Sequence, residues 1–381
     1  MRLRRAVLSL AVTLSLCVMS PRHAAAESPI EAALHPFVAS NWLAGAVTVA
    51  VGSEGIISHD AVGYADVAEK KPMPKDSLFW IASMTKPITA VAFMMLVDEG
   101  KVSLDTPVKT YIPQMDNLWV IDSETNGTRV LKRQSRPITM RHLLSHTSGL
   151  PFLTPMLIAD LASQPLDQQV LSFTMNPLEF QPGEGYRYSN EGIDTAGRVI
   201  EIVSGMPYET FLQKRIFDPL GMSDTTFFPT RQQVKRLAKT YRADKETGGL
   251  KEDKLPFIQP PFDGPGRYPE PGGGLFSTGD DLARFCQMLL NDGVYKENRL
   301  LSETAFTELT RVQTGQPQHK YGLGFAVDQH GQGAFGHGGA AGTNMTIFPR
   351  RGLALIWLVQ VNGGHPGQGG HAQGAFGAVF Q

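Results

Sequence analysis

Strand-like segments lie at the two ends of this chain, and a long stretch of helices and loops separates them. Near the start, residues 44–64 are rich in small and β-branched residues around a turn at 52–55, which predicts an antiparallel hairpin. Near the end, residues 321–327, 334–348 and 353–361 are predicted to form three more strands. We therefore expect an α+β fold: one five-stranded antiparallel sheet, closed by both ends of the chain, with a large and mostly helical insertion.

Helical patterns flank and interrupt these strands. Residues 28–43 and the tail from 368 to 380 predict helices at the two termini, and these would cover the sheet. Apolar residues at helical spacing predict a helix from Ser83 to about Gly100, where glycine supplies the stop. A second helix is predicted over residues 276–290, with Ser277 or Thr278 as its cap. Asn126-Gly127 is typical of the tight turn of a small hairpin within the insertion.

The first 26 residues have the pattern of a secretory signal peptide. Three arginines precede a short apolar stretch, and Ala24-Ala25-Ala26 offers a cleavage site. No apolar run is long enough to predict a stable membrane span. We expect an exported protein, periplasmic or secreted, with one domain over residues 27–381. Within it, a sheet subdomain would comprise about 27–75 and 315–381, and a helical subdomain about 76–314.

The net charge of the chain limits its partners, and its cysteine content limits its disulfides. Removal of residues 1–26 takes away four arginines and no acidic residue, so the formal net charge falls from −1 to −5. A mildly acidic protein has no electrostatic reason to bind nucleic acid or an anionic membrane. Cys286 is then the one remaining cysteine, so the fold must depend on its core and not on disulfides. Its apolar surroundings predict a packed side chain and not a nucleophile.

Ser83-Met84-Thr85-Lys86 is the strongest local signal of chemistry. Ser83 is the one serine in the chain with lysine three positions later, and residues i and i+3 share a helix face. Lys86 can therefore reach the hydroxyl of Ser83 and activate it as a nucleophile. Taken alone, the pattern equally describes a helix cap followed by a surface lysine.

Tyr188-Ser189-Asn190 is the second candidate, after a loop-forming Pro182-Gly183. A tyrosine holds its proton to about pH 10, but a nearby ammonium such as Lys86 would lower its pKa and make Tyr188 a base. Asn190 is placed to hold Lys86 and to donate to a substrate carbonyl. Taken alone, this is an ordinary turn with a packed aromatic ring.

His337-Gly338-Gly339-Ala340 is the third candidate, expected at the head of a strand. Its two glycines let a substrate approach the backbone closely. The N–H groups of Ala340 and Ser83 would then form an oxyanion hole, with His337, Gly338 and Gly339 beside the substrate. An ordinary glycine-rich turn is the simpler interpretation.

The order of the three motifs resembles the serine β-lactamase and penicillin-binding protein superfamily, whose members carry S-x-x-K, then Y-x-N or S-x-N, then K-T-G or H-x-G. The stretches Phe79–Lys86, Arg141–Leu150 and Gly272–Thr278 are similar to those of the class C β-lactamase and family VIII esterase branch. This resemblance runs from about residue 30 to 380. It implies the β-lactamase/transpeptidase-like fold, with a sheet flanked by helices.

The resemblance also implies a covalent mechanism. Ser83 attacks a carbonyl while Tyr188 and Lys86 move the proton. The N–H groups of Ser83 and Ala340 hold the oxyanion, and water then hydrolyses the acyl-enzyme. No cofactor and no metal take part. The substrate would be a small ester, an amide, or a D-amino-acid or peptidoglycan-like compound.

One departure bears on the substrate. His337 and Gly338 stand where many β-lactamases have lysine and threonine, which help to hold the substrate carboxylate. Histidine is only partly charged near neutral pH. The sequence therefore favours a carboxylesterase. The alternatives are a D-Ala-D-Ala carboxypeptidase or D-aminopeptidase, a β-lactamase, and a catalytically silent cell-wall-binding protein of the same fold.

Other chemistries find no support in the sequence. No serine has glycine at both −2 and +2, so the nucleophile elbow of α/β-hydrolases is absent. His142 and His146 are four residues apart on a predicted helix, but no acidic residue completes a metal site there, and we interpret both as structural. Loops near 115–135, 150–160 and 255–272 are expected to shape the substrate pocket.

Overall fold

The computed structural model describes residues 27–263, 266–315, 318–328, 331 and 333–381. The predicted signal peptide, residues 1–26, lies outside the described residues. The division of the remaining chain into a sheet subdomain and a helical subdomain stays a prediction.

An antiparallel sheet joins the two ends of the chain, as the sequence predicted. Its strand order is β12-β13-β14-β15-β1-β2-β3. At the centre, β1 from the start of the chain pairs with β15 from its end, with Val47 opposite Leu358 and Gly52 opposite Leu353. The strands are β1 (Gly45–Gly52), β2 (Gly55–Asp66), β3 (Lys71–Pro72), β12 (Ala326–Val327), β13 (Phe335–Gly338), β14 (Asn344–Phe348) and β15 (Leu353–Leu358).

Five of these strands have four or more residues, but all three predicted C-terminal strands were wrong in detail. The strand predicted over 353–361 ends at Leu358, and Val361–Asn362 belong to another sheet. The predicted strand over 334–348 is two strands, β13 and β14, with a turn between them at 339–343 where Gly342 has a φ of 84°. The predicted strand over 321–327 reduces to the two residues of β12. The five-stranded sheet is confirmed, with the two-residue strands β12 and β3 added at its edges.

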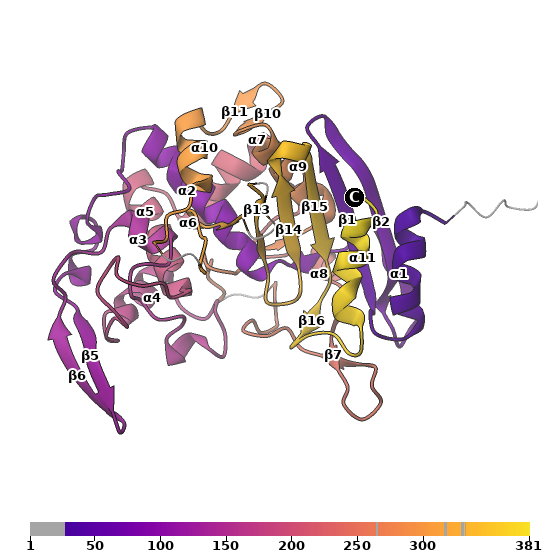
Figure 1. Cartoon of the computed structure of the whole chain (residues 1–381), viewed down its shortest axis with the longest axis horizontal. Coiled ribbons are helices and arrows are strands. Elements are labelled where there is room, and N and C mark those ends of the chain that lie inside the picture. Colours follow the sequence, from indigo (N-terminus) through magenta and orange to yellow (C-terminus); the bar gives the residue numbers. More distant parts are fainter. Residues whose placement is uncertain (1–26, 264–265, 316–317, 329–330, 332) are drawn as a thin grey trace, which may run out of the picture.

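Helices cover both faces of the sheet. The predicted terminal helices are α1 (Pro29–Ala39) and α11 (Ala372–Ala378), which pack together over one face (Figure 1). Their apolar side chains meet the sheet in a small core that contains Ile30, Leu34, Trp357 and Phe376. On the opposite face, α9 (Gly279–Leu290) packs against β1 and β15. Its first residue lies so close to β1 that a Cβ at Gly279 would be 2.9 Å from Val49.

The helix α2 (Thr85–Asp98) runs through the interior of the molecule. Every residue from Thr85 to Leu96 is buried, which is the pattern of a helix surrounded by protein on all sides. A 3-10 turn at Ala82–Met84 precedes it, and Gly100 with a φ of 66° follows its end. The prediction of a helix between Ser83 and Gly100 is therefore confirmed. Because a central helix is fixed by its whole surroundings, it is a rigid support for a site at its first turn.

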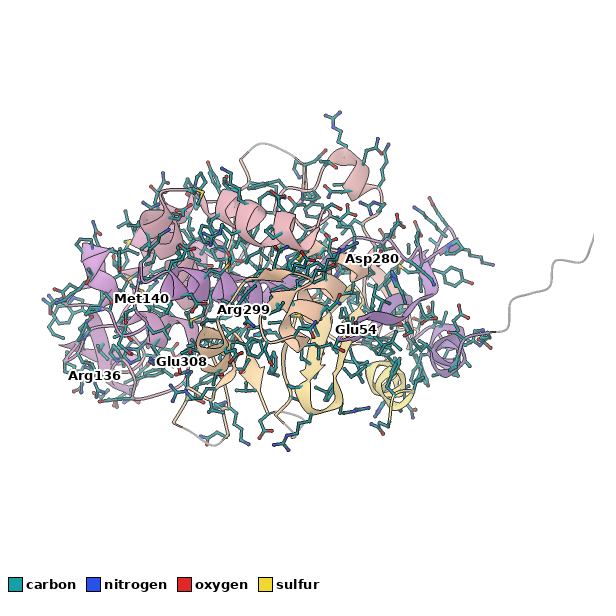
Figure 2. The ribbon with its side chains drawn as sticks, turned by 90° about the horizontal axis from the view of Figure 1, so that it is seen from above. Glu54, Arg136, Met140, Asp280, Arg299 and Glu308 are labelled. Atoms are coloured by element: carbon teal, nitrogen blue, oxygen red, sulfur yellow. The ribbon has the colours of Figure 1, made fainter. Side chains whose placement is uncertain are left out.

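The insertion extends beyond the sheet, and its residues 119–144 make one end of the molecule (Figure 1). Seen from above, Arg136 and Met140 lie at this end, whereas Glu54 and Asp280 lie towards the sheet (Figure 2). Its helices are α3 (Met140–Leu144), α4 (Leu166–Phe173), α5 (Asn190–Ser204), α6 (Tyr208–Leu212), α7 (Asp218–Leu220), α8 (Arg231–Val234) and α10 (Glu303–Thr310). None of the described helices is long and apolar enough to cross a membrane.

Short strand pairs also occur in the insertion, which was predicted to hold helices and loops with one hairpin. That hairpin is confirmed as β5 (Trp119–Thr125) and β6 (Thr128–Arg133), with positive φ at Asn126 and Gly127. The predicted helix from residue 276 instead begins with β9 (Phe276–Ser277), and α9 follows after its cap, Thr278. The remaining short strands of the insertion are β4 (Phe79–Trp80), β7 (Thr240–Ala243), β8 (Leu250–Asp253), β10 (Val294–Tyr295) and β11 (Asn298–Arg299). Outside the insertion, β16 (Val361–Asn362) follows β15 and pairs with β7.

Candidate active site

Ser83 lies on a sharp turn between the short strand β4 and the helix α2. Ala82 has a φ of 47°, a left-handed conformation that costs a residue with a Cβ roughly 1–2 kcal/mol. The turn is fixed on one side by the backbone bond from Ile81 N to Leu275 O, 3.0 Å long. Ser83 is half-buried, between fully buried neighbours. The strained turn thus presents one hydroxyl at the first turn of a rigid helix.

Lys86 is completely buried, and three oxygen atoms surround its ammonium group. Nζ donates to Asn190 Oδ1 at 2.6 Å, to the carbonyl of Gly272 at 2.5 Å and to Ser83 Oγ at 3.2 Å. Burial lowers the pKa of Lys86 to about 8, while the nearby carboxyl groups of Glu270 and Asp194 oppose that shift. Lys86 therefore contacts Ser83 Oγ, and its lowered pKa brings its proton exchange closer to neutral pH.

Tyr188 completes this group. It forms a side-chain hydrogen bond with Ser83, and Lys86 Nζ lies 4.7 Å from the centre of its ring. The ring keeps some exposed surface, yet protein atoms enclose it closely, and burial raises the pKa of Tyr188 above its ordinary value. The expectation that Lys86 lowers this pKa was wrong, because desolvation of the phenolate outweighs the attraction of the ammonium. Tyr188 therefore keeps its proton at neutral pH.

Asn190 is the first residue of α5, and its amide is held in one orientation. Its backbone N–H donates to Phe152 O at 3.0 Å, and the helix cap Ser189 donates through its hydroxyl to Pro151 O at 2.6 Å. Because Asn190 Oδ1 accepts from Lys86, its NH₂ group is the end that remains for a substrate carbonyl. Among the described residues this NH₂ group has no partner.

His337 is the third residue of β13 and lies near the end of that strand, not at its head as predicted. Its Nδ1 lies 2.6 Å from the carbonyl of Gly338, and its Nε2 lies 2.9 Å from the Tyr321 hydroxyl. A carbonyl can only accept, so we assign the proton to Nδ1 and let Nε2 accept from Tyr321. Burial lowers the pKa of His337 to about 3. The imidazole is therefore neutral, and not partly charged as the sequence suggested.

The backbone after His337 runs directly past the nucleophile turn. A Cβ at Gly339 would lie 2.5 Å from the carbonyl of Ile81 and 3.3 Å from Ala82 Cβ, so no larger residue fits there. Ala340 is exposed beside it, and within the described residues its N–H has no hydrogen-bond partner. The structure thus brings Gly338, Gly339 and Ala340 next to the turn that carries Ser83. Their roles as oxyanion hole and substrate contacts stay predictions.

His146 also belongs to this neighbourhood, although the sequence indicated only a structural role. The helix α3 ends at Leu144, so His142 and His146 do not share a helix face as predicted. His146 has a φ of 60°, is fully buried, and its Nδ1 accepts from Ser189 N at 3.2 Å. Its ring centre lies 4.6 Å from that of Tyr188. The H-T-S-G segment was the available signal, but no spacing rule connects it to Tyr188.

Two buried carboxyl groups, Asp194 and Glu270, were missed by sequence reasoning. Both side chains have no exposed surface and lie close to Lys86, whose pKa they influence. Asp194 is on α5, one helical turn after Asn190, while Glu270 is in the loop before β9. Nothing in their local sequence distinguishes them from surface acids. In the described part of the chain, no group of three or more His, Cys, Asp or Glu side chains is arranged for a metal ion.

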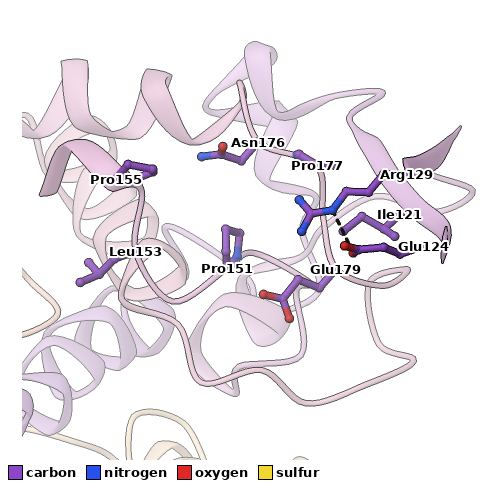
Figure 3. A pocket seen from close by; sticks show the side chains of 9 residues that line it. All are labelled: Ile121, Glu124, Arg129, Pro151, Leu153, Pro155, Asn176, Pro177 and Glu179. Atoms are coloured by element: carbon purple, nitrogen blue, oxygen red, sulfur yellow. Dashed lines mark hydrogen bonds and ion pairs between the residues drawn. The ribbon is translucent and has the colours of Figure 1, made fainter. Parts of the chain in front are cut away.

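A separate hollow of about 460 Å³ lies beyond the loop 151–155 (Figure 3). The hairpin β5–β6 contributes Ile121 and the ion pair of Glu124 with Arg129, while Pro151 and Leu153 face it from the loop. Two of the loops predicted to shape the substrate pocket line this hollow. Of its lining residues, Pro151 accepts the bond from Ser189 and so adjoins the site. None of the predicted site residues lines it.

The fold and the contact between Ser83, Lys86 and Tyr188 define a serine hydrolase of the S-x-x-K class. The family model Beta-lactamase matches residues 30–379, and the chain belongs to this family. Protein Rv1367c of Mycobacterium tuberculosis (strain ATCC 25618 / H37Rv) is 31% identical over 361 residues, which cover 87% of this chain and 89% of that protein.

Two further likenesses concern named hydrolases. The lovastatin esterase of Penicillium rubens (strain ATCC 28089 / DSM 1075 / NRRL 1951 / Wisconsin 54-1255) is 36% identical over 270 residues, which cover 66% of this chain and 65% of that enzyme. Among solved structures, EstCE1, "a hydrolase with promiscuous acyltransferase activity", superposes with a TM-score of 0.76 at 24% identity, over 93% of this chain and 98% of that one. The fold and the family are therefore those that the three motifs indicated.

Proposed function

We propose that this chain is a carboxylesterase that cleaves small esters through an acyl-Ser83 intermediate. The observation that carries the choice of esters is the neutral His337 beside Gly338. β-Lactamases place a lysine and a threonine at these positions to hold the substrate carboxylate. A neutral imidazole offers no charge to such a group and Gly338 offers no hydroxyl, which favours substrates without a free carboxylate. A relative of the chain that is named an esterase supports the same choice.

In the proposed first half-reaction, Ser83 Oγ attacks the ester carbonyl while its proton leaves. Neutral Lys86 Nζ, 3.2 Å from Oγ, accepts that proton directly or through the Tyr188 hydroxyl, which gives its own proton to Lys86 as it takes the proton of Ser83. The N–H groups of Ser83 and Ala340 stabilise the oxyanion. Collapse of the tetrahedral intermediate breaks the bond to the alcohol oxygen, which receives the proton. Water repeats these steps on the acyl-enzyme and releases the acid.

A D-amino-acid or peptide amide is the second candidate substrate. The NH₂ group of Asn190, whose Oδ1 is occupied by Lys86, can donate to an amide carbonyl as well as to an ester carbonyl. Turnover of an amide needs a proton delivered to the leaving nitrogen, and Tyr188 is placed for that. The same reagents that test the esterase can separate this alternative.

We also propose that residues 1–26 are a signal peptide and that the mature enzyme acts in the periplasm or outside the cell. The arginines, the short apolar stretch and the run of three alanines support this. Expression of the whole chain in a bacterial host, followed by N-terminal sequencing of the exported fraction, would test it. Cleavage after Ala26 is expected, and an uncut chain that stays in the cytoplasm would contradict the proposal.

The esterase proposal is tested by intact-mass spectrometry of the mature protein. Separate samples receive a fluorophosphonate, a short p-nitrophenyl ester, a D-alanyl anilide and a penicillin, with Ser83→Ala as the matched control. We expect one fluorophosphonate adduct on Ser83 that the control lacks, and turnover of the ester ahead of the other two substrates. Turnover led by the anilide would favour the peptidase. No adduct on a folded protein would favour the catalytically silent binding protein.

A further inference from the structure

We propose that Asp194 and Glu270 are a positioning pair that shares one proton and sets one negative charge beneath Lys86. This inference deepens the proposed function and rests on it, because it assigns the groups that control the protonation of the base. Neither carboxyl group touches the position of a substrate. The pair acts on the reaction through Lys86, and Glu270 also raises the pKa of Tyr188.

The contacts of the two carboxyl groups require a proton between them. Asp194 Oδ1 accepts from Gly272 N at 2.8 Å, but Asp194 Oδ2 and both Glu270 oxygens are buried without a donor if both groups are ionised. The two carboxyl groups lie within hydrogen-bond distance of each other. One proton shared between them joins one oxygen of each group, since a protonated carboxyl group donates and a carboxylate accepts, and leaves the second Glu270 oxygen to the backbone N–H groups of Gly272 and Gly273. Two buried carboxylates in contact would otherwise repel each other strongly.

The loop that carries Glu270 also holds Lys86. Gly272 donates through its N–H to Asp194 and accepts through its carbonyl from Lys86. A Cβ at Gly272 would lie 2.8 Å from Glu270 Oε1 and 3.0 Å from Asn190 Cγ, so the carboxyl group occupies the space beside the amide that also binds Lys86. The pair therefore lies beside Lys86, next to the carbonyl of Gly272 that accepts from its ammonium group.

The other groups that face Lys86 carry no charge. The rings of His146 and His337 lie against Tyr188, with ring centres 4.6 Å and 6.0 Å from that of Tyr188, and burial lowers the pKa of each imidazole well below its ordinary value. Tyr188 keeps its proton because burial raises its pKa. Among the described residues, the Asp194–Glu270 pair is thus the one anion that balances the ammonium. Burial raises the pKa of both carboxyl groups, in keeping with one retained proton.

Substitutions can test the shared proton and the negative charge of the pair independently. Asp194→Asn or Glu270→Gln replaces the shared proton by an amide N–H and leaves one carboxylate, so the charge stays. The double variant Asp194→Asn/Glu270→Gln removes the charge while keeping the shape. Glu191→Gln is the matched control, because Glu191 is a buried carboxyl group on the same helix, its pKa is raised to about 9, and it exerts no effect on Lys86.

The first measurement is the rate of Ser83 labelling by a fluorophosphonate from pH 5 to 10. In the wild type this rate should rise with pH to a midpoint near 8, as Lys86 loses its proton. The double variant should move the midpoint down by at least one pH unit, whereas the single variants and Glu191→Gln should stay within about half a unit. A folded double variant with an unmoved midpoint would overturn the inference. Absence of labelling in the wild type would instead contradict the proposed function.

The second measurement does not depend on activity and also serves if the double variant does not fold. Guanidinium unfolding at pH 7.5 under a pH-stat counts the protons released, since carboxyl groups protonated in the fold ionise in the unfolded chain. The wild type should release one proton from the pair and one from Glu191. Glu270→Gln should release one fewer, and Asp194→Asn should do the same. Equal release by the wild type and both single variants would show that no proton is shared.

Discussion

The two walls of the active site differ in charge. On the wall formed by α2 and α5, Lys86 lies against the Asp194–Glu270 pair, so ionic groups are buried together. On the wall formed by β13, His337 and Tyr321 are joined by a neutral hydrogen bond of 2.9 Å. Charge is therefore present where a proton must move and absent where a substrate carboxylate would bind. This difference is what separates the proposed esterase from a β-lactamase built on the same sheet.

The largest loss of activity should come from removing Lys86, the charged group on the first wall, which is the wall formed by α2 and α5. Lys86→Met keeps the volume of the side chain but removes the base, so ester turnover should fall by roughly 10⁴-fold. The measurement is kcat/KM on a p-nitrophenyl ester, with a thermal melt to show that the variant is folded. A loss below about tenfold would mean that another group accepts the proton of Ser83.

A smaller loss is expected when the relay is cut and the ring is kept. Tyr188→Phe preserves the packing against His146 and Phe152 but removes the hydroxyl bonded to Ser83. Since Lys86 still reaches Ser83 directly, kcat/KM should fall by roughly 10²-fold and not to the level of Lys86→Met. If the two variants lose activity equally, the proton passes only through Tyr188.

The pH dependence of kcat/KM should follow the titration of Lys86 on the first wall and not that of His337 on the second. Because Lys86 must be neutral to accept a proton and its pKa is about 8, kcat/KM should increase about tenfold per pH unit below 8 and then level off. The second wall should add no step near pH 6.5, since the pKa of His337 is about 3.

The free energy of unfolding should also depend on pH, through two buried imidazoles. The folded pKa values of His337 and His146 are depressed, so the unfolded state binds more protons below about pH 6.5. The free energy of unfolding should therefore decrease as the pH falls from 6.5 towards 3. An activity step near pH 6.5 would show that one of these imidazoles is charged in the working enzyme.

The sequence predicted the parts of the molecule that depend on local patterns. The sheet from both chain ends, the helix after Ser83 and the Asn126-Gly127 turn follow from periodicity and turn chemistry. The split of residues 334–348 into two strands did not, because a turn of small residues at 339–343 continues the pattern of a strand. The contact of Lys86 with Ser83 follows from the i, i+3 spacing, and the contact with Asn190 was expected from the second motif, whereas the contact with the carbonyl of Gly272 was not predicted.

The electrostatics of the site could not be predicted in the same way. Tyr188 and His337 have shifted pKa values because segments distant in sequence bury them, and burial is a property of the fold. Asp194 and Glu270 are separated by 75 intervening residues of unrelated local structure. They come together because the loop that carries Glu270 packs against Asn190 at Gly272, whose N–H donates to Asp194. The sequence shows which groups can ionise, whereas the structure shows which of them are buried away from water.

The smallest change in activity should come from placing a positive charge on the second wall, which is the wall formed by β13. His337→Lys restores the cation that β-lactamases carry at this position, so it should improve a substrate with a free carboxylate relative to its methyl ester. A partly exposed ion pair contributes about 1 kcal/mol at most, so the ratio of the two kcat/KM values should rise about fivefold. His337→Gln is the neutral control and should leave the ratio unchanged. If His337→Gln raises the ratio as much as the lysine does, steric exclusion by the imidazole, and not its missing charge, keeps carboxylates out.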